Sequence, residues 1–577
     1  MKNKIKIIYK ILISVFILLL MISFTGCVDI ESPARFETDI KEGTETEKST
    51  EASTVDSYED NMELFFNIKN KQKDKNILNN INVRLAIFHA IDRSRIVSEL
   101  FEDKNNVLNS LFSENSSFSN PIWKDFEYNK EKAIEYLKTA GYGPENPLYL
   151  TIGSNDNSAT RQKIEEIIKE NLEEIGINIW ISNHPSSEWY NDYIRLGNYE
   201  LALWSLYTSS PDELVNYFSS TKIPVNETFE NQNCNNFYWY SDTVTDENLQ
   251  KLKSAKDIDE KKEITNEIQS KIFKDSFILP LFSRLYAVAF NNNIKNLRIN
   301  PADGNYLSDI QKIKLNSPED EEKELIIGTD NIPSTMNPLL EENIFMNYIN
   351  SIVTRGLWKI DKDGIYIPDL IEEEKSLTTI SRSDNSVFIT LKDDIFWQDG
   401  MRVDSGDVKA TIEAIIADKN LNLKETGYKN IKEIKIISDT EFYIYFTDPV
   451  QNYERLFTLI LPEKMLENES ISNILIDDSF GCGPYKITEW IKEKYMVLEK
   501  NIYYKDNLSE IDKIRIVFES DKNLLISALK NEDIDLVSIP VDLELINELE
   551  ENENIDVLIE KGNLWEHLAI CLKPAEQ

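Results

Sequence analysis

The sequence predicts an α/β protein built from two large blocks, and three observations support this. The chain has 577 residues, several times the ~150 residues typical of one domain. Hydrophobic residues make up 41% and charged residues 28%, which are ordinary values for a globular protein. Strand and helix patterns alternate along the chain, which is typical of sheets covered by helices. We therefore expect more than one large hydrophobic core.

An export signal is predicted at the N-terminus. Four lysines within the first ten residues precede an apolar run at 11–22. The run is shorter than the ~20 residues that span a bilayer, but it has the length of a signal-peptide core. It ends at Phe24-Thr25-Gly26-Cys27, which resembles the lipobox of bacterial lipoproteins. The resemblance implies a signal peptide over 1–27 and a lipid attached to Cys27; an ordinary signal peptide with an incidental cysteine is the alternative.

The next segment, 28–60, is expected to be a disordered acidic tether. It is rich in Glu, Thr, Ser, Asp and Lys and shows almost no apolar periodicity. Such a segment buries too little apolar surface to offset the entropy of ordering it. About 30 residues of this kind have a root-mean-square reach of roughly 30 Å. We expect a folded body that is lipid-anchored at the extracytoplasmic face of the cell membrane.

The first block, about 62–315, contains a strand–helix–strand unit. A helix pattern at 128–140 is followed by a strand pattern at 148–152. An amphipathic helix at 160–175 then leads to a strand at 177–181. Both helix patterns end at a glycine, as helices commonly do. A unit of this kind implies a sheet with helices packed on it.

A second block, about 325–577, follows an acidic linker at 316–324 that has one proline and no hydrophobic residue. Alternating strand patterns occur at 387–391 and 441–446, and a helix pattern occurs at 524–529. The two blocks share no period or motif, so they are not a simple internal duplication.

Charge and composition argue against several classes of protein. With 101 acidic and 63 basic residues the net charge is −38, which repels nucleic acid. Four cysteines in so long a chain do not form a disulfide framework. The only histidines are His89, His184 and His567, and none lies in a zinc-hydrolase motif. We expect no enzyme activity, no cofactor and no metal site.

Motifs in the second block resemble one family. The segment 396–408 (FWQDGMRVDSGDV) suggests a strand, a tight turn at Gly400 and a helix capped by Asp404 or Ser405. The segment 481–487 (GCGPYKI) suggests another turn. Both are similar to motifs of the family 5 solute-binding proteins of ABC importers, which include oligopeptide-, dipeptide- and nickel-binding proteins.

The first block carries two further motifs of this family, at 83–93 (VRLAIFHAIDR) and 131–142 (EKAIEYLKTAGY). In the family these motifs follow those of the second block, so their order here is inverted. A circular permutation and a fusion of two truncated genes are the two explanations. The segments 62–67 and 564–572, at the two ends of the body, resemble the same family strand, which favours permutation.

The resemblance implies a two-lobed, periplasmic-binding-protein-like (type II) α/β fold with mixed sheets, circularly permuted. Residues 61–285 would form the family's second lobe and 286–577 its first lobe, with the 316–324 linker joining the ancestral ends. Two expectations follow. The apolar stretch Tyr286–Phe290 should lie with the second block, and the segments 62–67 and 564–571 should be adjacent ends of one severed strand.

The implied function is solute binding without catalysis. The protein would capture a peptide or another small solute in a cleft between lobes and deliver it to an ABC permease with its ATPase. Such a cleft closes on its ligand and buries most of it. A surface sensor or adhesin that does not transport, or a degenerate fusion that keeps the fold, is the alternative.

Candidate ligand contacts follow from the same resemblance. Peptide binders of the family commonly place an Asp three residues after a Trp, to pair with the ammonium group of the ligand. Here Tyr207 follows Trp204 at that spacing. The resemblance implies that Tyr207 faces the ligand, although a phenol does not neutralise an ammonium near neutral pH. Asp212 is the candidate to compensate. Trp204 and Trp397 are expected as flat walls and Asn155 as an amide contact; core packing for the tryptophans and a turn role for Asn155 are the alternatives.

Overall fold

The computed structural model divides the chain into two units, residues 1–63 and 64–577. The predicted signal peptide, Cys27 and tether fall in the first unit and lie outside the described residues. The structure describes residues 62–574 except for 63, 72–75, 102–105, 225–233, 256, 317–321, 334, 336, 338, 340–343, 362, 382, 419–420, 422–426, 449, 451–452, 467–470, 472–479 and 507–508. Most of the predicted linker is among these gaps.

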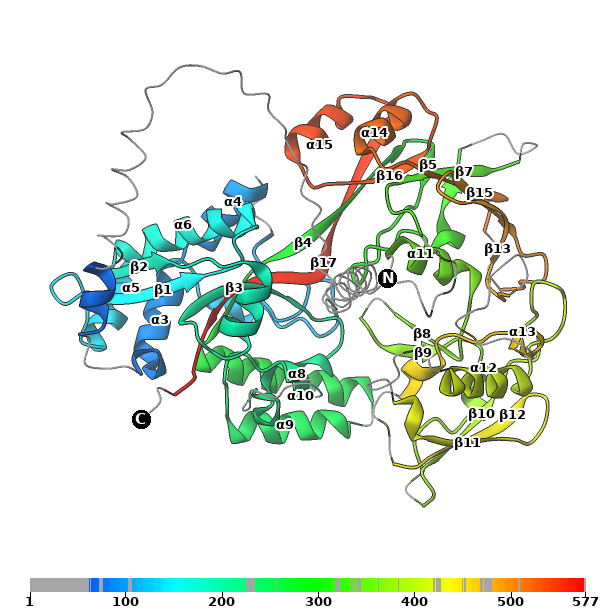
Figure 1. Ribbon diagram of the computed structural model, residues 1–577, viewed down its shortest axis with the longest axis horizontal. Helices are drawn as coiled ribbons and strands as arrows, with labels where there is room; N and C mark the ends of the chain where they lie inside the picture. The colour runs from blue at the N-terminus through cyan, green and yellow to red at the C-terminus, as the bar shows by residue number, and fades with distance from the viewer. Residues whose placement is uncertain are drawn as a thin grey trace, which may run out of the picture. The chain divides into compact units, whose positions relative to one another are not determined.

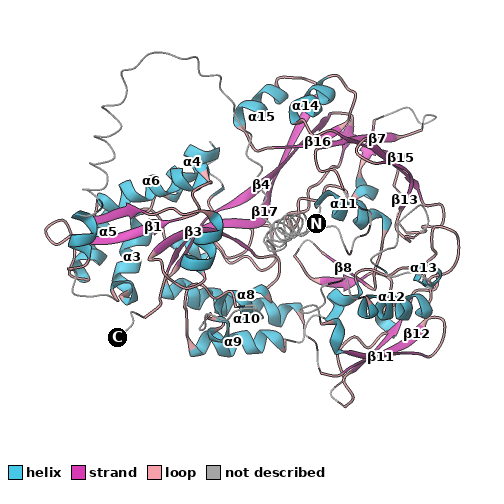
Figure 2. Ribbon diagram, viewed as in Figure 1, coloured by secondary structure: helices cyan, strands magenta, loops and turns pink. Residues whose placement is uncertain are grey.

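A ten-stranded mixed sheet joins the two blocks (Figures 1 and 2). Its strand order is β13-β14-β15-β7-β16-β4-β17-β3-β1-β2. Strand β1 pairs in parallel with β2 and β3, whereas β17 is antiparallel to β3 and β4. The predicted α/β class with mixed sheets is therefore confirmed. The strands of this sheet are β1 Leu148–Gly153, β2 Ile177–Ile181, β3 Leu201–Tyr207, β4 Ile278–Asn291, β7 Glu324–Thr329, β13 Tyr485–Ile491, β14 Tyr495–Lys500, β15 Lys513–Phe518, β16 Leu536–Ile539 and β17 Ile555–Ile570.

The long strands β4 and β17 run side by side and carry the chain between the two parts of the sheet (Figure 1). Strand β4 comes from the first block, yet Ala287–Phe290 pairs with β16 of the second block. Strand β17 comes from the second block, yet Leu564–Ile570 pairs with β3 of the first block. The structure confirms that the two blocks share one sheet and that Tyr286–Phe290 lies with the second block.

Helices of the first block cover its strands, and α6 packs on β2 (Figure 2). The predicted helices at 128–140 and 160–175 and both predicted strands of the unit form within two residues of their expected bounds. The helix α6 begins where the Ser158 hydroxyl accepts a hydrogen bond from the Arg161 N–H. The helices of this block are α3 Ile81–Ala90, α4 Arg93–Phe101, α5 Lys130–Thr139, α6 Ala159–Glu173, α7 Ser186–Glu188, α8 Glu213–Phe218, α9 Thr243–Lys253 and α10 Ile258–Asp275.

Among the described residues, the second block adds two smaller sheets and five α-helices, and the short strands β5 and β6 near the end of the first block form a further two-stranded sheet. Its three-stranded sheet has the order β10-β12-β11, and β8 pairs with β9. As expected, Asp404 caps α12 through a capping box with Asp407, and Gly400 takes the left-handed turn with φ 86°. The remaining elements are β5 Ile294–Lys295, β6 Lys314–Leu315, α11 Ile344–Val353, β8 Trp358–Ile360, β9 Tyr366–Pro368, β10 Ser386–Thr390, α12 Ser405–Ala417, β11 Ile431–Ile436, β12 Glu441–Phe446, α13 Glu463–Leu466, α14 Lys522–Lys530 and α15 Leu543–Glu550.

The expected strand at 62–67 is wrong, because the described residues 64–69 are helical. Lys69 forms an ion pair with Glu200, whose carbonyl accepts a hydrogen bond from the Cys571 N–H at 3.0 Å. The segment therefore lies beside the end of β17 without joining the sheet. The physical reason is that β17 already pairs on both of its edges there, with β3 and β4, so no strand edge is left open.

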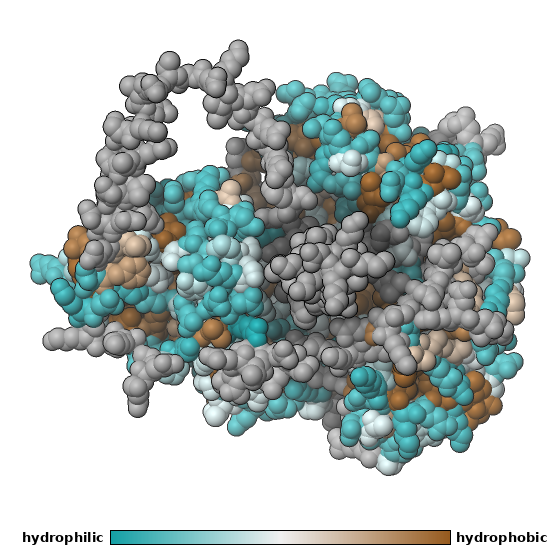
Figure 3. Space-filling model, viewed as in Figure 1, coloured by the Kyte–Doolittle hydropathy of each residue, from teal (hydrophilic) through white to brown (hydrophobic). Residues whose placement is uncertain are grey.

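The described surface matches the charge-rich composition. On the face shown in Figure 3, hydrophilic residues cover most of that surface and apolar residues form small separate groups. Among the residues that the structure describes, none of the helices has both the length and the apolar character needed to cross a bilayer.

Candidate functional site

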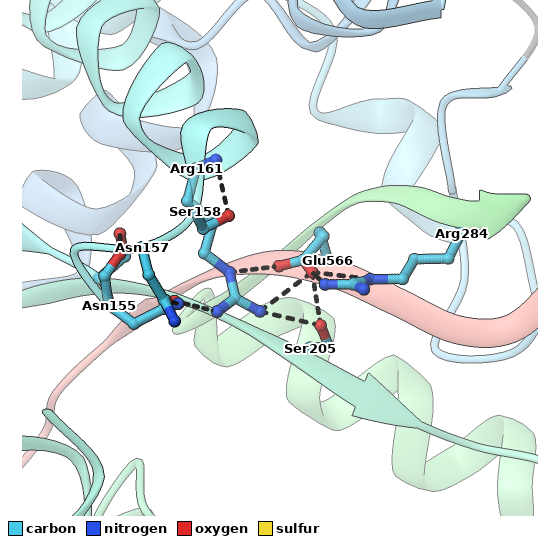
Figure 4. A network of polar contacts seen from close by, with 8 residues as sticks. Asn155, Asn157, Ser158, Arg161, Ser205, Arg284 and Glu566 are labelled. Atoms are coloured by element: carbon cyan, nitrogen blue, oxygen red, sulfur yellow. Dashed lines mark hydrogen bonds and ion pairs between the residues drawn. The ribbon is translucent and has the colours of Figure 1, made fainter. Parts of the chain in front are cut away.

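The crossing strands β4 and β17 and the neighbouring strand β3 share one face that carries polar and charged side chains (Figure 4). Residues two apart on a strand point to the same face. Ser205 and Tyr207 therefore share a face of β3, and Arg284 and Tyr286 share a face of β4. Glu566 of β17 lies opposite Ser205 and joins these neighbours. We call this surface the crossing face.

Glu566 is the centre of a buried ionic network on the crossing face (Figure 4). Its carboxylate accepts hydrogen bonds from the Arg161 guanidinium at 3.1 and 3.2 Å and from Arg284 Nη2 at 2.7 Å. Its side chain is 3% exposed. Burial alone raises the pKa of Glu566, but the two guanidinium groups outweigh burial and lower that pKa to about 2. The network therefore carries a net charge of +1 at neutral pH.

Asn155 belongs to the same network. Its amide oxygen accepts a hydrogen bond from Arg161 Nη1, and its amide nitrogen donates to Asn157. The side chain is buried and orients the guanidinium that binds Glu566. The structure thus places Asn155 near Ser205 through Arg161. Its role as a direct ligand contact stays a prediction.

Trp204 and Tyr207 are not brought together. They are three residues apart on β3, so their side chains point to opposite faces of the strand. The Trp204 ring packs against Tyr238 and His567 at centroid distances of 5.3 and 4.7 Å. This arrangement is the core-packing alternative for Trp204. Trp204 and Tyr207 therefore do not both contact a ligand on the crossing face.

Trp397 lies in a different core, which forms around the β10–β12–β11 sheet. Its side chain is 2% exposed, and its indole N–H donates to Asp407 Oδ2 at 2.9 Å. The ring therefore supports the capping box of α12. Its position again corresponds to core packing rather than to a wall of the crossing face.

Two acidic residues follow β3 at the start of α8. Asp212 forms an ion pair with Lys261 at 3.6 Å. Glu213 accepts backbone hydrogen bonds from Ser209 at 2.8 Å and Ser210 at 3.4 Å. Burial raises the pKa of Glu213 to about 7. Burial also raises the pKa of Tyr207 to about 12, so its phenol is protonated at neutral pH.

Arg284, Tyr286 and Asp303 lie on or beside the crossing face and are candidate residues that the sequence analysis missed. The loop that carries Asp303 adjoins the end of β3, because the Asn563 N–H donates to Pro301 O at 2.8 Å and the Thr208 N–H donates to Asn563 O at 3.1 Å. A sequence signal existed for Arg284, which is the one charged residue in the otherwise apolar stretch 277–290. No comparable signal marks Asp303.

The chemistry of the crossing face suits recognition of a charged solute. The Arg284 side chain, which is one-third exposed, lies two residues before Tyr286 on β4. The negative charge of Asp303 contributes to the raised pKa of the Tyr286 phenol. Among the described residues, no group of three or more His, Cys, Asp or Glu side chains is arranged to hold a metal ion.

Two cavities that lie away from the crossing face are both lined by the loop 197–200. One has a volume of about 390 Å³ and is bordered by 76–79 and by Cys571, Lys573 and Pro574. The other, of about 410 Å³, is bordered by Phe66, Lys69, Trp189 and Tyr193, among others. Neither cavity is lined by Ser205, Tyr207, Arg284, Tyr286 or Glu566 of the crossing face.

Comparison with known proteins gives a family-level match. The family model of "Bacterial extracellular solute-binding proteins, family 5 Middle" matches residues 29–224 and 366–574, more than half of the chain. The dipeptide-binding protein DppE of Bacillus subtilis is 21% identical over 274 residues, covering 44% of this chain and 49% of that protein. The glutathione-binding protein GsiB of Salmonella paratyphi A is 25% identical over 253 residues, covering 43% and 48%.

A solved structure is also similar in part. The crystal structure of NikZ from Campylobacter jejuni in complex with Ni(L-His) is 27% identical, with a TM-score of 0.36, and the match covers 41% of this chain and 46% of that chain. The chain spans about half the length of the curated relatives that it matches.

Proposed function

Because the chain belongs to the bacterial extracellular solute-binding proteins of family 5, we propose that it is the substrate-binding component of an ABC importer. In this role it captures a peptide or another small solute outside the cytoplasm. It then delivers the solute to a membrane permease that an ATPase drives. The protein itself performs no catalysis.

The crossing face is the observation that supports a location for the solute-binding site. It places the Arg284 guanidinium and the Tyr286 phenol on β4, which runs between the two blocks, and the Tyr207 phenol on β3, which is separated from β4 by β17. In a binding protein that closes around its ligand, such strands border both halves of the site. A solute with charged ends fits this surface better than an apolar one.

The anchor is proposed from the N-terminal sequence. Cys27 carries the lipid, and the segment 28–60 lets the folded body reach the permease beside the membrane. Metabolic labelling with a fatty-acid analogue checks this. Label is expected in the wild type and absent in Cys27→Ala, and equal labelling of both would contradict the anchor.

We also propose that the chain is a circular permutation of the family fold, with 61–285 as one lobe and 286–577 as the other. The shared sheet supports this, because β4 and β17 cross between the blocks. The proximity of chain segments gives further support. Lys573 and Pro574 border the same cavity as Asn76–Asn79, so the end of the second block lies beside the start of the first.

A thermal-shift screen of the purified protein tests the binding function. The library should contain di-, tri- and oligopeptides, glutathione and nickel chelates. We expect one class to raise the melting temperature in a dose-dependent manner, because a ligand that binds only the folded state stabilises it. No shift across the library, with cooperative unfolding intact, would contradict the proposed function.

A further inference from the structure

The cavity of about 410 Å³ lies in the outer part of the first block, away from the crossing face. It is lined by Thr151 and Gly153, which share one face of β1, and by Ser182, which follows β2. Its volume falls within the range of roughly 300–1,000 Å³ that small-molecule sites occupy. We call it the β1 cavity. The proposed import function does not use it.

Two short helical segments provide aromatic walls for the β1 cavity. The described residues 64–69 are helical, and the Phe66 ring packs on Trp180 of β2 at a centroid distance of 6.2 Å. The segment Trp189–Ile194 is a π-helix, and it contributes Trp189 and Tyr193 to the lining. A π-helical turn is rare and occurs frequently at functional sites.

Two glycines determine the shape of the β1 cavity. A Cβ at Gly153 would lie 2.4 Å from Ser182 O and 2.8 Å from the Trp189 ring, so this ring packs directly on the backbone of β1. Gly197 has φ +64° and begins the loop 197–200, which also lines the cavity. A larger residue at position 153 would displace the aromatic wall.

The polar groups of the β1 cavity leave one acceptor and one donor available. Glu200 Oε2 accepts hydrogen bonds from the Thr151 N–H at 2.7 Å and from the Thr151 hydroxyl at 2.8 Å, and it pairs with Lys69. Among the described residues, no group donates to Glu200 Oε1, and the Tyr193 hydroxyl has no hydrogen-bond partner. The Glu200 side chain is 28% exposed, so its carboxylate is not sealed from solvent.

These features favour a neutral ligand that carries hydroxyl groups. Lys69 already balances the charge of Glu200, so an ionic ligand would bring a charge that has no partner in the cavity. The half-buried rings of Phe66 and Tyr193 provide apolar surface. A carboxylate oxygen accepts a hydrogen bond from a hydroxyl group, and a phenol donates one. A sugar ring matches this set, because it has an apolar face of C–H groups and a rim of hydroxyl groups.

We propose that the β1 cavity is a second binding site and takes a neutral hexopyranose. The sugar ring lies against the aromatic wall that Phe66 and Tyr193 form, and a sugar hydroxyl donates to Glu200 Oε1. No residue of the crossing face named above lines this cavity, so sugar binding and solute capture are separate activities.

Saturation-transfer NMR of the purified protein tests this with four probes: glucose, N-acetylglucosamine, choline and adenine. We expect saturation to reach at least one of the two sugars, and neither choline nor adenine. Tyr193→Ala should weaken sugar binding at least five-fold, because it removes both the ring and the hydroxyl group. The control is Tyr190→Ala, a residue of the same π-helix that is 39% exposed and does not line the cavity. It should bind the sugar as the wild type does.

Further measurements keep the assignment of the site open to refutation. Tyr193→Phe keeps the ring, so it should weaken sugar binding about two-fold and less than Tyr193→Ala. Thermal unfolding of each variant checks that the fold is retained. Equal sugar affinity in the wild type and both Tyr193 variants would place the sugar elsewhere. Binding of choline or adenine but of neither sugar, or of no probe at all, would overturn the proposal.

A competition experiment separates this site from the import site. Excess peptide that raises the melting temperature in the thermal-shift screen should leave the sugar signal unchanged. Displacement of the sugar by that peptide would assign the sugar to the crossing face and overturn the second site. The proposed import function would stand in either case.

Discussion

At the scale of single residues, Glu566 holds together elements that are far apart in the sequence. Its carboxylate joins Arg161 of α6, Ser205 of β3 and Arg284 of β4. Replacing one partner of a buried ionic group leaves the others without a counter-charge, which typically costs about 3–5 kcal/mol. We therefore expect Glu566→Gln to lower the free energy of unfolding by about 3 kcal/mol or more, measured by urea denaturation.

The matched control for this variant is Glu510→Gln. Glu510 is 43% exposed and pairs with Lys314 and Lys323 at the surface. Exposed pairs are screened by water and salt and contribute little. If Glu510→Gln lowered the free energy of unfolding as much as Glu566→Gln, burial would not explain the stabilising effect of the Glu566 network.

His567, next along β17, predicts a pH dependence of stability. Burial lowers its pKa from 6.5 to about 3, and its Nε2 lies 2.8 Å from the Tyr238 hydroxyl. Between these two pH values the unfolded chain binds a proton that the folded protein does not. The contribution of the buried, neutral His567 to the free energy of unfolding is therefore fully present above pH 6.5. It is lost as pH falls toward the folded-state pKa, with a slope of about 1.4 kcal/mol per pH unit.

Urea unfolding between pH 6 and pH 4 measures that slope. We expect His567→Gln to reduce it by about one proton equivalent. Tyr238→Phe removes the hydroxyl partner but keeps His567 buried, so it should leave the slope in place. If the free energy of unfolding of His567→Gln falls with pH as steeply as that of the wild type, other groups cause the acid sensitivity.

At the scale of elements, α12 shows how local sequence sets a boundary. The Asp404 side chain accepts hydrogen bonds from the Gly406 N–H at 2.7 Å and the Asp407 N–H at 3.2 Å. Removing such a cap costs roughly 1 kcal/mol. We expect that loss of stability in Asp404→Ala, measured by chemical denaturation. Asp404→Asn keeps an acceptor and should lose much less; equal losses would point away from capping.

At the scale of the whole molecule, the shared sheet predicts that chain order is not essential to the fold. A rearranged chain that joins residues 324–574 directly to 76–315 restores the order of motifs seen in the family. We expect it to unfold cooperatively and to bind the same solute as the natural chain. The junction is short because Pro574 and Asn76 border one cavity.

A second rearrangement provides the comparison. Opening the chain at 166, in the middle of α6, cuts a helix that packs on β2. This variant should fold poorly, judged by circular dichroism and thermal unfolding. If the 324–574/76–315 chain also failed to fold, the permutation would be contradicted and a fusion of fragments favoured.

Local patterns alone determined several features of this protein: the strand–helix–strand unit at 148–181, the Asp404 cap and the Gly400 turn. These depend on neighbouring residues, so apolar spacing and turn chemistry are sufficient to predict them. The sequence also shows the inverted order of the family motifs. That order predicts that Tyr286–Phe290 lies with the second block.

Only the tertiary structure decided which side chains share a surface. Strand pairing places Glu566 between Arg161 and Arg284, hundreds of residues away in the chain, and strand alternation turns Trp204 away from Tyr207. The segment 62–67 resembles a family strand, but β17 occupies that place in the sheet, and the described residues 64–67 are helical instead. Which segment takes a given position in a sheet depends on all the strands of the protein, and a local sequence pattern does not include that information.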